Sequence, residues 1–161
     1  FLPEPGGSIR KLAVIERHRA TGNIGLGLVE GFGLSRGAVA TTIAHDSHNL
    51  IVLGENDADM LAAAEEIIRL GGGMCLASGG RILGSLALPI AGLMTNEPGE
   101  QVSEQLAELN RIAYETLEVN SDVDPFMTLS FLALPVIPEL KLTDMGLFDV
   151  GRFDFVNLEV E

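Results

Sequence analysis

The chain has 161 residues, of which 47% are apolar, and its formal net charge is -13. This length and apolar content suit one domain with a buried core and argue against disorder over most of the chain. The 23 acidic residues outnumber the 10 basic ones, which argues against a nucleic acid or an anionic membrane as partner, because both attract clustered Lys and Arg.

Residues 1–8, "FLPEPGGS", are rich in Pro and Gly and predict a linker, followed by one domain over residues 9–161. A strand is predicted over residues 9–16. The next segment, "GLGLVEGFGL" over residues 25–34, has the two-residue period of a strand. One face would carry Leu26, Leu28, Phe32 and Leu34, and the other Gly25, Gly27, Gly31 and Gly33. A face of glycines predicts close approach of another backbone, with a bend or a bound ligand as alternatives.

Two further strands are predicted over residues 37–44 and 50–54, because both runs are short, apolar and bounded by turn residues. A helix should follow, since Asn56 and Asp57 can cap its start and Gly71 can end it. Apolar residues recur at helical spacing within it: Met60, Ala64, Ile67 and Ile68.

The pair Gly79–Gly80, between two β-rich runs, predicts a hairpin. A second helix is predicted over residues 98–117, with an apolar stripe of Val102, Leu106, Leu109 and Ala113. A third helix should begin at Asp124 and end before Pro135. The tail over residues 151–161 alternates again and predicts a last strand.

These elements predict a mixed α+β domain, with a β-rich mixed sheet or sheets and about three helices packed against them. Cys75 is the only cysteine, so neither an internal disulfide nor a thiolate zinc site can form, and we expect this thiol in the core. The single cysteine and the lack of a signal peptide predict a cytoplasmic location. The chain begins at Phe1 and not at a methionine, which indicates a piece of a longer protein or a processed product.

The densest polar motif is "HDSHN", residues 45–49, between two predicted strands. Two of the three histidines of the chain lie in it, His45 and His48. On a helix their spacing would place both imidazoles on one face, and Asp46 could add a third metal ligand. In an extended segment they would lie on opposite faces. A polar turn is the simplest alternative, and a loop that faces a ligand or a catalytic site is another.

Two other polar clusters are weaker signals. "TNEPGE", residues 95–100, leads into the second predicted helix and is mostly typical of a helix start, with Glu97 as a candidate for facing a site. "ERHRATGN", residues 16–23, contains the remaining histidine, His18, between two arginines. We interpret it as a solvated strand end, with a binding edge as the alternative.

Three long stretches resemble the carboxy-terminal part of bacterial adenine deaminases of the amidohydrolase superfamily. They are "RHRATGNIGLGLVEGFGLSRGAVATTIAHDSHNLIVLGEND", "LPIAGLMTNEPGE" and "DPFMTLSFLALPVIPELKLTDMGLFDV", which occur in this order and span residues 17–150. The resemblance implies a hydrolase that converts adenine to hypoxanthine and ammonia, with manganese or iron on a (β/α)₈ barrel. It also implies that this domain is a separate unit packed on that barrel.

The barrel of this superfamily carries its first metal ligands as H-x-H, and the present chain contains no such motif. We therefore expect no metal site within this chain and no activity of the chain alone. The HDSHN motif matches the family signature, which implies that it faces the barrel. Its candidate catalytic residues are His45, Asp46 and His48, and its candidate substrate-binding residues are Ser47, Asn49 and Glu97.

The expected partners are the amidohydrolase barrel of the same polypeptide, adenine, and further copies in a homo-oligomer. Two alternatives from other classes remain. In the first, the chain is a structural or oligomerisation module without contact to substrate. In the second, it is a stand-alone domain that binds purines or a metal.

Overall fold

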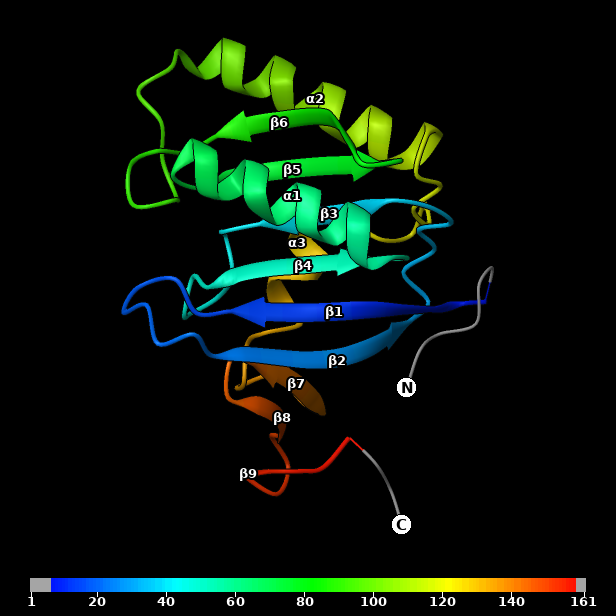
Figure 1. Ribbon diagram of the computed structural model, residues 1–161, viewed down its shortest axis with the longest axis vertical. Helices are drawn as coiled ribbons and strands as arrows, with labels where there is room; N and C mark the ends of the chain where they lie inside the picture. Colours follow the sequence, from blue (N-terminus) through cyan, green and yellow to red (C-terminus); the bar gives the residue numbers. More distant parts are fainter. Residues whose placement is uncertain (1–6, 159–161) are drawn as a thin grey trace.

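A computed structural model describes residues 7–158 of the chain. Its centre is a six-stranded sheet with the strand order β2-β1-β4-β3-β5-β6 (Figure 1). All neighbouring strands in it are antiparallel. The strands are β1 (Ile9–Ile15), β2 (Ile24–Glu30), β3 (Ala38–Thr41), β4 (Leu50–Gly54), β5 (Gly73–Ser78) and β6 (Arg81–Ala87).

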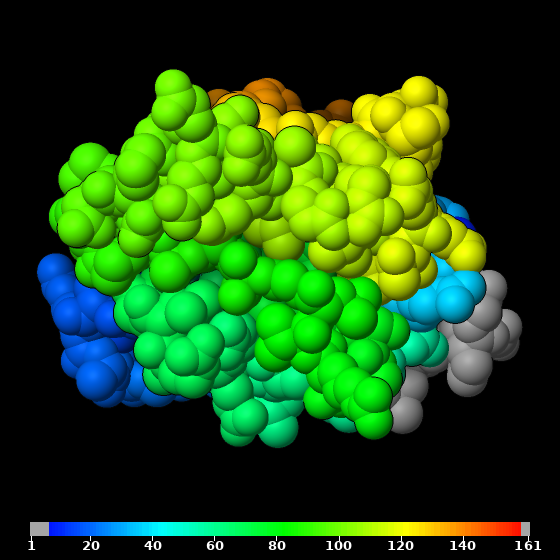
Figure 2. All heavy atoms as spheres, turned by 90° about the horizontal axis from the view of Figure 1, so that it is seen from above, coloured from blue at the N-terminus to red at the C-terminus, as the bar shows by residue number. Residues whose placement is uncertain are grey.

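The two faces of this sheet carry different layers. Helix α1 (Asp57–Leu70) packs over β3 to β6 on one face. The other face carries α2 (Gly99–Glu115), α3 (Met127–Phe131) and a small antiparallel sheet of β7 (Leu140–Thr143), β8 (Gly146–Asp149) and β9 (Asp154–Phe155). Figure 2 shows α2 in yellow-green on the side of the orange C-terminal segments and α1 in blue-green on the opposite side.

Each face has its own apolar core. The core under α1 is built mostly from small side chains and includes Cys75, which is fully buried as predicted, so that burial raises the pKa of its thiol to about 12. The larger core lies under α2, α3 and β7 and contains Leu34, Ile51, Leu53, Leu76 and Leu129. The mixed α+β fold class is confirmed, although the sheets are antiparallel and not mixed.

Helix α1 begins and ends where the sequence predicts. The side chain of Asn56 accepts a hydrogen bond from the backbone N–H of Asp59, and Gly71 ends the helix in the left-handed conformation at φ 76°. Of the predicted apolar stripe, Ala64 and Ile67 are buried, but Ile68 is 71% exposed. Ile68 has helical spacing but lies outside the buried face of α1, which covers only part of the sheet.

The glycine-rich strand β2 confirms the predicted close approach. A β-carbon on Gly25 would overlap the carbonyl oxygen of Thr143 in β7, and one on Gly27 would meet the side chain of Leu142 at 3.2 Å. The alternation does not continue to residue 34, however. Gly31 and Gly33 adopt φ values of 86° and 91°, which end the strand and turn the side chains that follow, Phe32 and Leu34, into the core.

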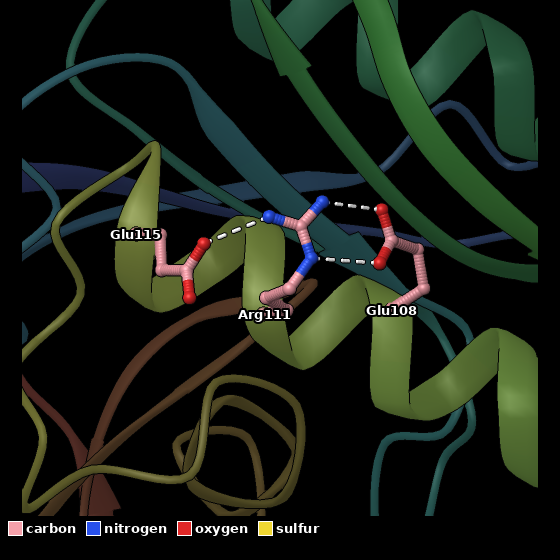
Figure 3. A network of polar contacts seen from close by, with 3 residues as sticks. All are labelled: Glu108, Arg111 and Glu115. Atoms are coloured by element: carbon pink, nitrogen blue, oxygen red, sulfur yellow. Dashed lines mark hydrogen bonds and ion pairs between the residues drawn. The ribbon is translucent and has the colours of Figure 1, made fainter.

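Helix α2 follows its predicted stripe, with Leu109 and Ala113 buried against the sheet. Its outer face carries an ion-pair network in which Arg111 donates to Glu108 at 2.6 and 2.8 Å and to Glu115 at 2.8 Å (Figure 3). These groups are exposed, so their pairs add little to stability.

The C-terminal third departs most from the sequence-based expectation. Asp124 accepts hydrogen bonds from the backbone N–H groups of Phe126 and Met127, as a cap should, but α3 has only five residues. The β7–β8 hairpin was not predicted. In the tail only β9 is extended, and residues 159–161 lie outside the described range.

Residues 1–6, most of the predicted linker, also lie outside the described range. The predicted division into a linker and one domain therefore stays a prediction. None of the helices between residues 7 and 158 combines the length and apolar character that crossing a membrane requires.

Candidate functional site

The HDSHN loop, residues 45–49, lies at one end of the central sheet, between β3 and β4. It forms a tight turn, in which the backbone N–H of His48 donates to the carbonyl of Ala44 at 2.5 Å. The Ser47 hydroxyl accepts a hydrogen bond from the backbone N–H of Asn49 at 3.3 Å. The polar-turn interpretation is thus confirmed as the local structure, and neither the helical nor the extended alternative applies.

The turn brings the two histidines together. Their ring centroids lie 6.2 Å apart, and the His45 ring stacks on Phe131 of α3 with a centroid distance of 4.9 Å. The Nδ1 atoms of both imidazoles are buried without a hydrogen-bond partner in the described part of the chain. Buried polar atoms are nearly always satisfied in folded proteins, so these two nitrogens are exceptions that mark the loop as a candidate site.

The protonation of His48 follows from its surroundings. Burial is the largest effect that lowers the pKa of its imidazole below the usual 6.5, and the nearby charges of His45 and Arg17 act in the same direction. The Asp46 carboxylate opposes them. His48 is therefore neutral at pH 7, with one ring nitrogen able to accept a proton and the other able to donate a hydrogen bond.

Two residues of the β1–β2 turn hold the HDSHN loop from outside. Arg17 donates from Nε to the carbonyl of His48 at 2.6 Å and from Nη2 to the carbonyl of Ala91 at 2.7 Å. The Nε2 atom of His18 lies 2.7 Å from the carbonyl of Ser47, so this nitrogen carries the proton. The interpretation of residues 16–23 as a solvated strand end is therefore wrong for Arg17, whose guanidinium is partly buried.

Glu16 organises this turn, a role that the sequence analysis missed. Its carboxylate accepts hydrogen bonds from the backbone N–H groups of His18, Arg19 and Thr21 at 2.5 to 3.0 Å. These bonds, the one from Thr21 foremost, lower the pKa of Glu16 to about 2. The carboxylate therefore stays ionised and keeps the turn in the shape that presents Arg17 and His18 to the loop.

Replacing Arg17 by alanine should loosen the HDSHN loop, because the carbonyls of His48 and Ala91 lose their hydrogen-bond donor. We expect hydrogen exchange of the amides of residues 45–49 to rise at least tenfold in the variant, since an unsatisfied polar group costs about 1–3 kcal/mol. Arg19→Ala is the matched control, because Arg19 is exposed and only its backbone contacts Glu16. Equal exchange in both variants would contradict a clamping role for Arg17.

The loop is tied to a distant segment through Asn49. This residue is 3% exposed, and its Nδ2 donates to the Asp144 carboxylate at 3.1 Å. Asn23 donates to the other oxygen of the same carboxylate at 3.3 Å. Asn49 thus has a structural bond already, and its predicted contact with substrate stays a prediction.

A pocket of about 410 Å³ opens beside the loop. Asp46, Ser47, Thr143 and Asp144 supply its polar groups, and the rest of its wall is apolar or aromatic: Ala133, Pro135, Val136, Met145, Phe148, Phe153 and Phe155. Such a combination suits a flat ring with polar edges, because the rings can stack on it while carboxylates accept its N–H groups. Apart from Asp46 and Ser47, the sequence analysis singled out none of these residues as site residues.

Glu97 is not brought to the loop by any contact in the described range. It is exposed just before α2, and its backbone N–H donates to the Thr95 hydroxyl at 3.3 Å. The preceding segment does reach the loop region, since the Thr42 hydroxyl donates to the carbonyl of Gly92 at 2.6 Å.

Among residues 7–158, no three His, Cys, Asp or Glu side chains are arranged to hold a metal ion. A self-contained metal site at His45, Asp46 and His48 therefore has no support. The described residues do not fit the manganese or iron that the resemblance implies.

Comparison with known proteins identifies the family. The model of the adenine deaminase C-terminal domain matches residues 1–154. The chain is 61% identical over 156 residues to an adenine deaminase of Nitratidesulfovibrio vulgaris. This alignment covers 97% of the present chain and 27% of that protein. Adenine deaminases of Clostridium acetobutylicum and Bacillus licheniformis are 57% and 52% identical, with 97% and 99% of this chain and 27% and 28% of those proteins covered.

The chain thus spans only about a quarter of the length of these relatives. The match nevertheless includes nearly all of the described structure, with the HDSHN loop and the residues that hold it. This chain belongs to the family of adenine deaminase C-terminal domains.

Proposed function

We propose that this chain is the accessory domain of a hydrolytic adenine deaminase, which converts adenine to hypoxanthine and ammonia, and that its HDSHN loop faces the substrate. One observation supports this role most directly: His45 and His48 lie together at a domain edge with two buried nitrogens that have no partner within the described chain. The names of the relatives support the reaction.

In this proposal the loop supplies proton transfer and hydrogen bonds. Deamination needs a proton delivered to the leaving amine, and an imidazole that is neutral near pH 7 can take up a proton and pass it on. His48 and His45 are our candidates for this role, with Asp46 as an acceptor for the N–H groups of the base. Adenine also offers ring nitrogens as acceptors and an amine as donor, which suits the other candidates, Ser47, Asn49 and Glu97.

The remaining parts of the proposal lie outside this chain. We assign the manganese or iron to an amidohydrolase barrel in the rest of the polypeptide, because the described residues do not fit a metal. We further propose that the full-length enzyme is a cytoplasmic homo-oligomer that acts in purine breakdown or salvage.

A purely structural role is the second candidate. It is favoured by the hydrogen bonds that the loop already makes within the domain. Arg17 and His18 bond carbonyls of the loop, and Asn49 of the loop donates to Asp144. In that case the loop would stabilise the edge of the domain and leave turnover unaffected.

An ultraviolet assay of adenine conversion tests the proposal. The full-length protein with manganese should produce hypoxanthine, and the purified chain of 161 residues with the same metal should produce none. Calorimetric titration of the chain with adenine and with manganese tests the stand-alone binding alternative. Metal-dependent conversion by the chain alone would overturn the assignment of the metal to another domain, and a full-length protein inactive on adenine would overturn the proposed reaction.

A further inference from the structure

Helix α1 leaves part of the sheet uncovered. It packs over β3 to β6, while the same side of β1 and β2 has no described helix in front of it (Figure 1). The strand register shows which side chains point there. Leu50 of β4 belongs to the core under α1 and pairs with Ile15, which in turn pairs with Ile24 of β2. Every second residue from Ile24 therefore shares that face: the apolar Ile24, Leu26 and Leu28, and then Glu30 at the end of the strand.

These three side chains are large, apolar and open to water. Ile24 is 54% exposed, Leu26 61% and Leu28 39%. On the exposed side of an antiparallel sheet polar residues are expected, and an edge strand is ordinarily protected by charges. The only charged residue of β2 is Glu30, at its end, although the chain contains 33 charged residues, 23 acidic and 10 basic.

Helix α1 extends the same apolar surface. The carboxylate of Asp57 pairs with Lys11 of β1 at 2.5 Å, so this flank of the helix faces β1. Leu61 and Ile68 follow Asp57 by 4 and 11 residues, which places them on the same flank. They are 59% and 71% exposed. Ile68 therefore lies on the flank of α1 that faces the uncovered strands.

We infer that this surface, formed by Ile24, Leu26, Leu28, Leu61 and Ile68 and here called the β1–β2 face, packs against the part of the full-length polypeptide that precedes this domain. The length of the relatives and the position of this domain within them indicate what covers the surface. The chain covers 27% of its relatives and matches their C-terminal domain, so about three quarters of the polypeptide precedes it. The family resemblance implies that this domain packs on a barrel, but it does not identify the surface of the domain that makes this contact.

The turn that joins β1 and β2 also contacts the candidate site. The two strands meet in the turn of residues 16–23, and His18 of that turn bonds the carbonyl of Ser47 at 2.7 Å. The turn therefore connects the end of these strands to the HDSHN loop. The inference rests on packing and family membership, and it does not require the loop to be catalytic.

Carbene footprinting of the full-length protein and of the isolated chain tests the inference without relying on activity. Labelling of Leu26, Leu28, Leu61 and Ile68 should fall at least fivefold in the full-length protein. Ile82, a 39% exposed isoleucine on β6 at the opposite edge of the sheet, is the reference and should change less. Equal labelling of the face in both proteins would overturn the inference.

A pair of variants adds a second measurement. Leu26→Glu and Ile82→Glu should each leave the melting temperature of the isolated chain within about 2 °C of wild type, because both side chains are exposed. In the full-length protein only Leu26→Glu should lower the melting temperature and restore labelling of the face. If the isolated chain instead forms a dimer whose protection of Leu26 rises with concentration, the occupant is a second copy and the inference is wrong.

Discussion

Replacing both His45 and His48 by alanine in the full-length enzyme is expected to lower kcat for adenine by about 10²–10⁴-fold, the usual contribution of general acid–base catalysis. The physical reason is the loss of both proposed proton carriers, whose ring centroids lie 6.2 Å apart and whose buried Nδ1 atoms have no hydrogen-bond partner among residues 7–158. Steady-state kinetics with adenine, followed by ultraviolet absorbance, measures the effect. The single variants should show which histidine carries the larger share.

The control for this experiment must separate chemistry from folding, because His45 also stacks on Phe131. His48→Gln keeps a polar side chain of similar size without an imidazole, and circular dichroism reports whether the fold survives. Arg81→Ala is the reference variant, since Arg81 is exposed at the start of β6, outside the described loop contacts. Unchanged turnover in the folded double variant would contradict the catalytic role of the two histidines and favour a structural one.

Gly25→Ala should be the most damaging single substitution of a glycine in β2. The added methyl group would overlap the carbonyl oxygen of Thr143, which belongs to backbone and cannot rotate away. We expect a loss of about 3 kcal/mol in the free energy of unfolding, at the upper end of the range for overpacking. Urea denaturation of the isolated chain measures it.

Two further glycines provide graded controls. Gly27→Ala meets only the flexible side chain of Leu142, at 3.2 Å, and should cost about 1 kcal/mol. Gly99→Ala meets no atom within 4 Å and lies at the start of α2, so it should be neutral or stabilise by up to about 1 kcal/mol. If Gly25→Ala is no worse than Gly99→Ala, the contact between β2 and β7 does not exist in solution.

The Gly25 variant also links stability to the candidate site. Thr143 is followed by Asp144, which accepts hydrogen bonds from Asn49 of the HDSHN loop and from Asn23. A shift of β7 away from β2 would therefore pull on the loop. We expect increased hydrogen exchange at residues 45–49 to accompany the loss of stability.

Local chemistry was enough to predict the elements whose signals lie within a few residues. The Asn56 cap and the Gly71 stop define α1, and the Gly79–Gly80 turn defines the β5–β6 hairpin. The glycine face of β2 predicted a close backbone contact because a strand face without side chains leaves room for another segment to pack directly on it. The sequence also singled out the HDSHN motif by its density of polar residues, and its resemblance identified the family.

Tertiary structure decided what depends on contacts between distant segments. Ile68 has the spacing of a buried residue and is exposed, because α1 covers only β3 to β6. The same holds at the site, where Arg17 and Asp144 lie 31 and 95 residues from the loop residues they bond. No periodicity connects such positions, since only the folding of the sheet brings the β1–β2 turn and β7 to the loop. The sequence by itself thus determined the elements and the polar motif, while the tertiary structure alone decided which residues hold that motif and which apolar face is left uncovered.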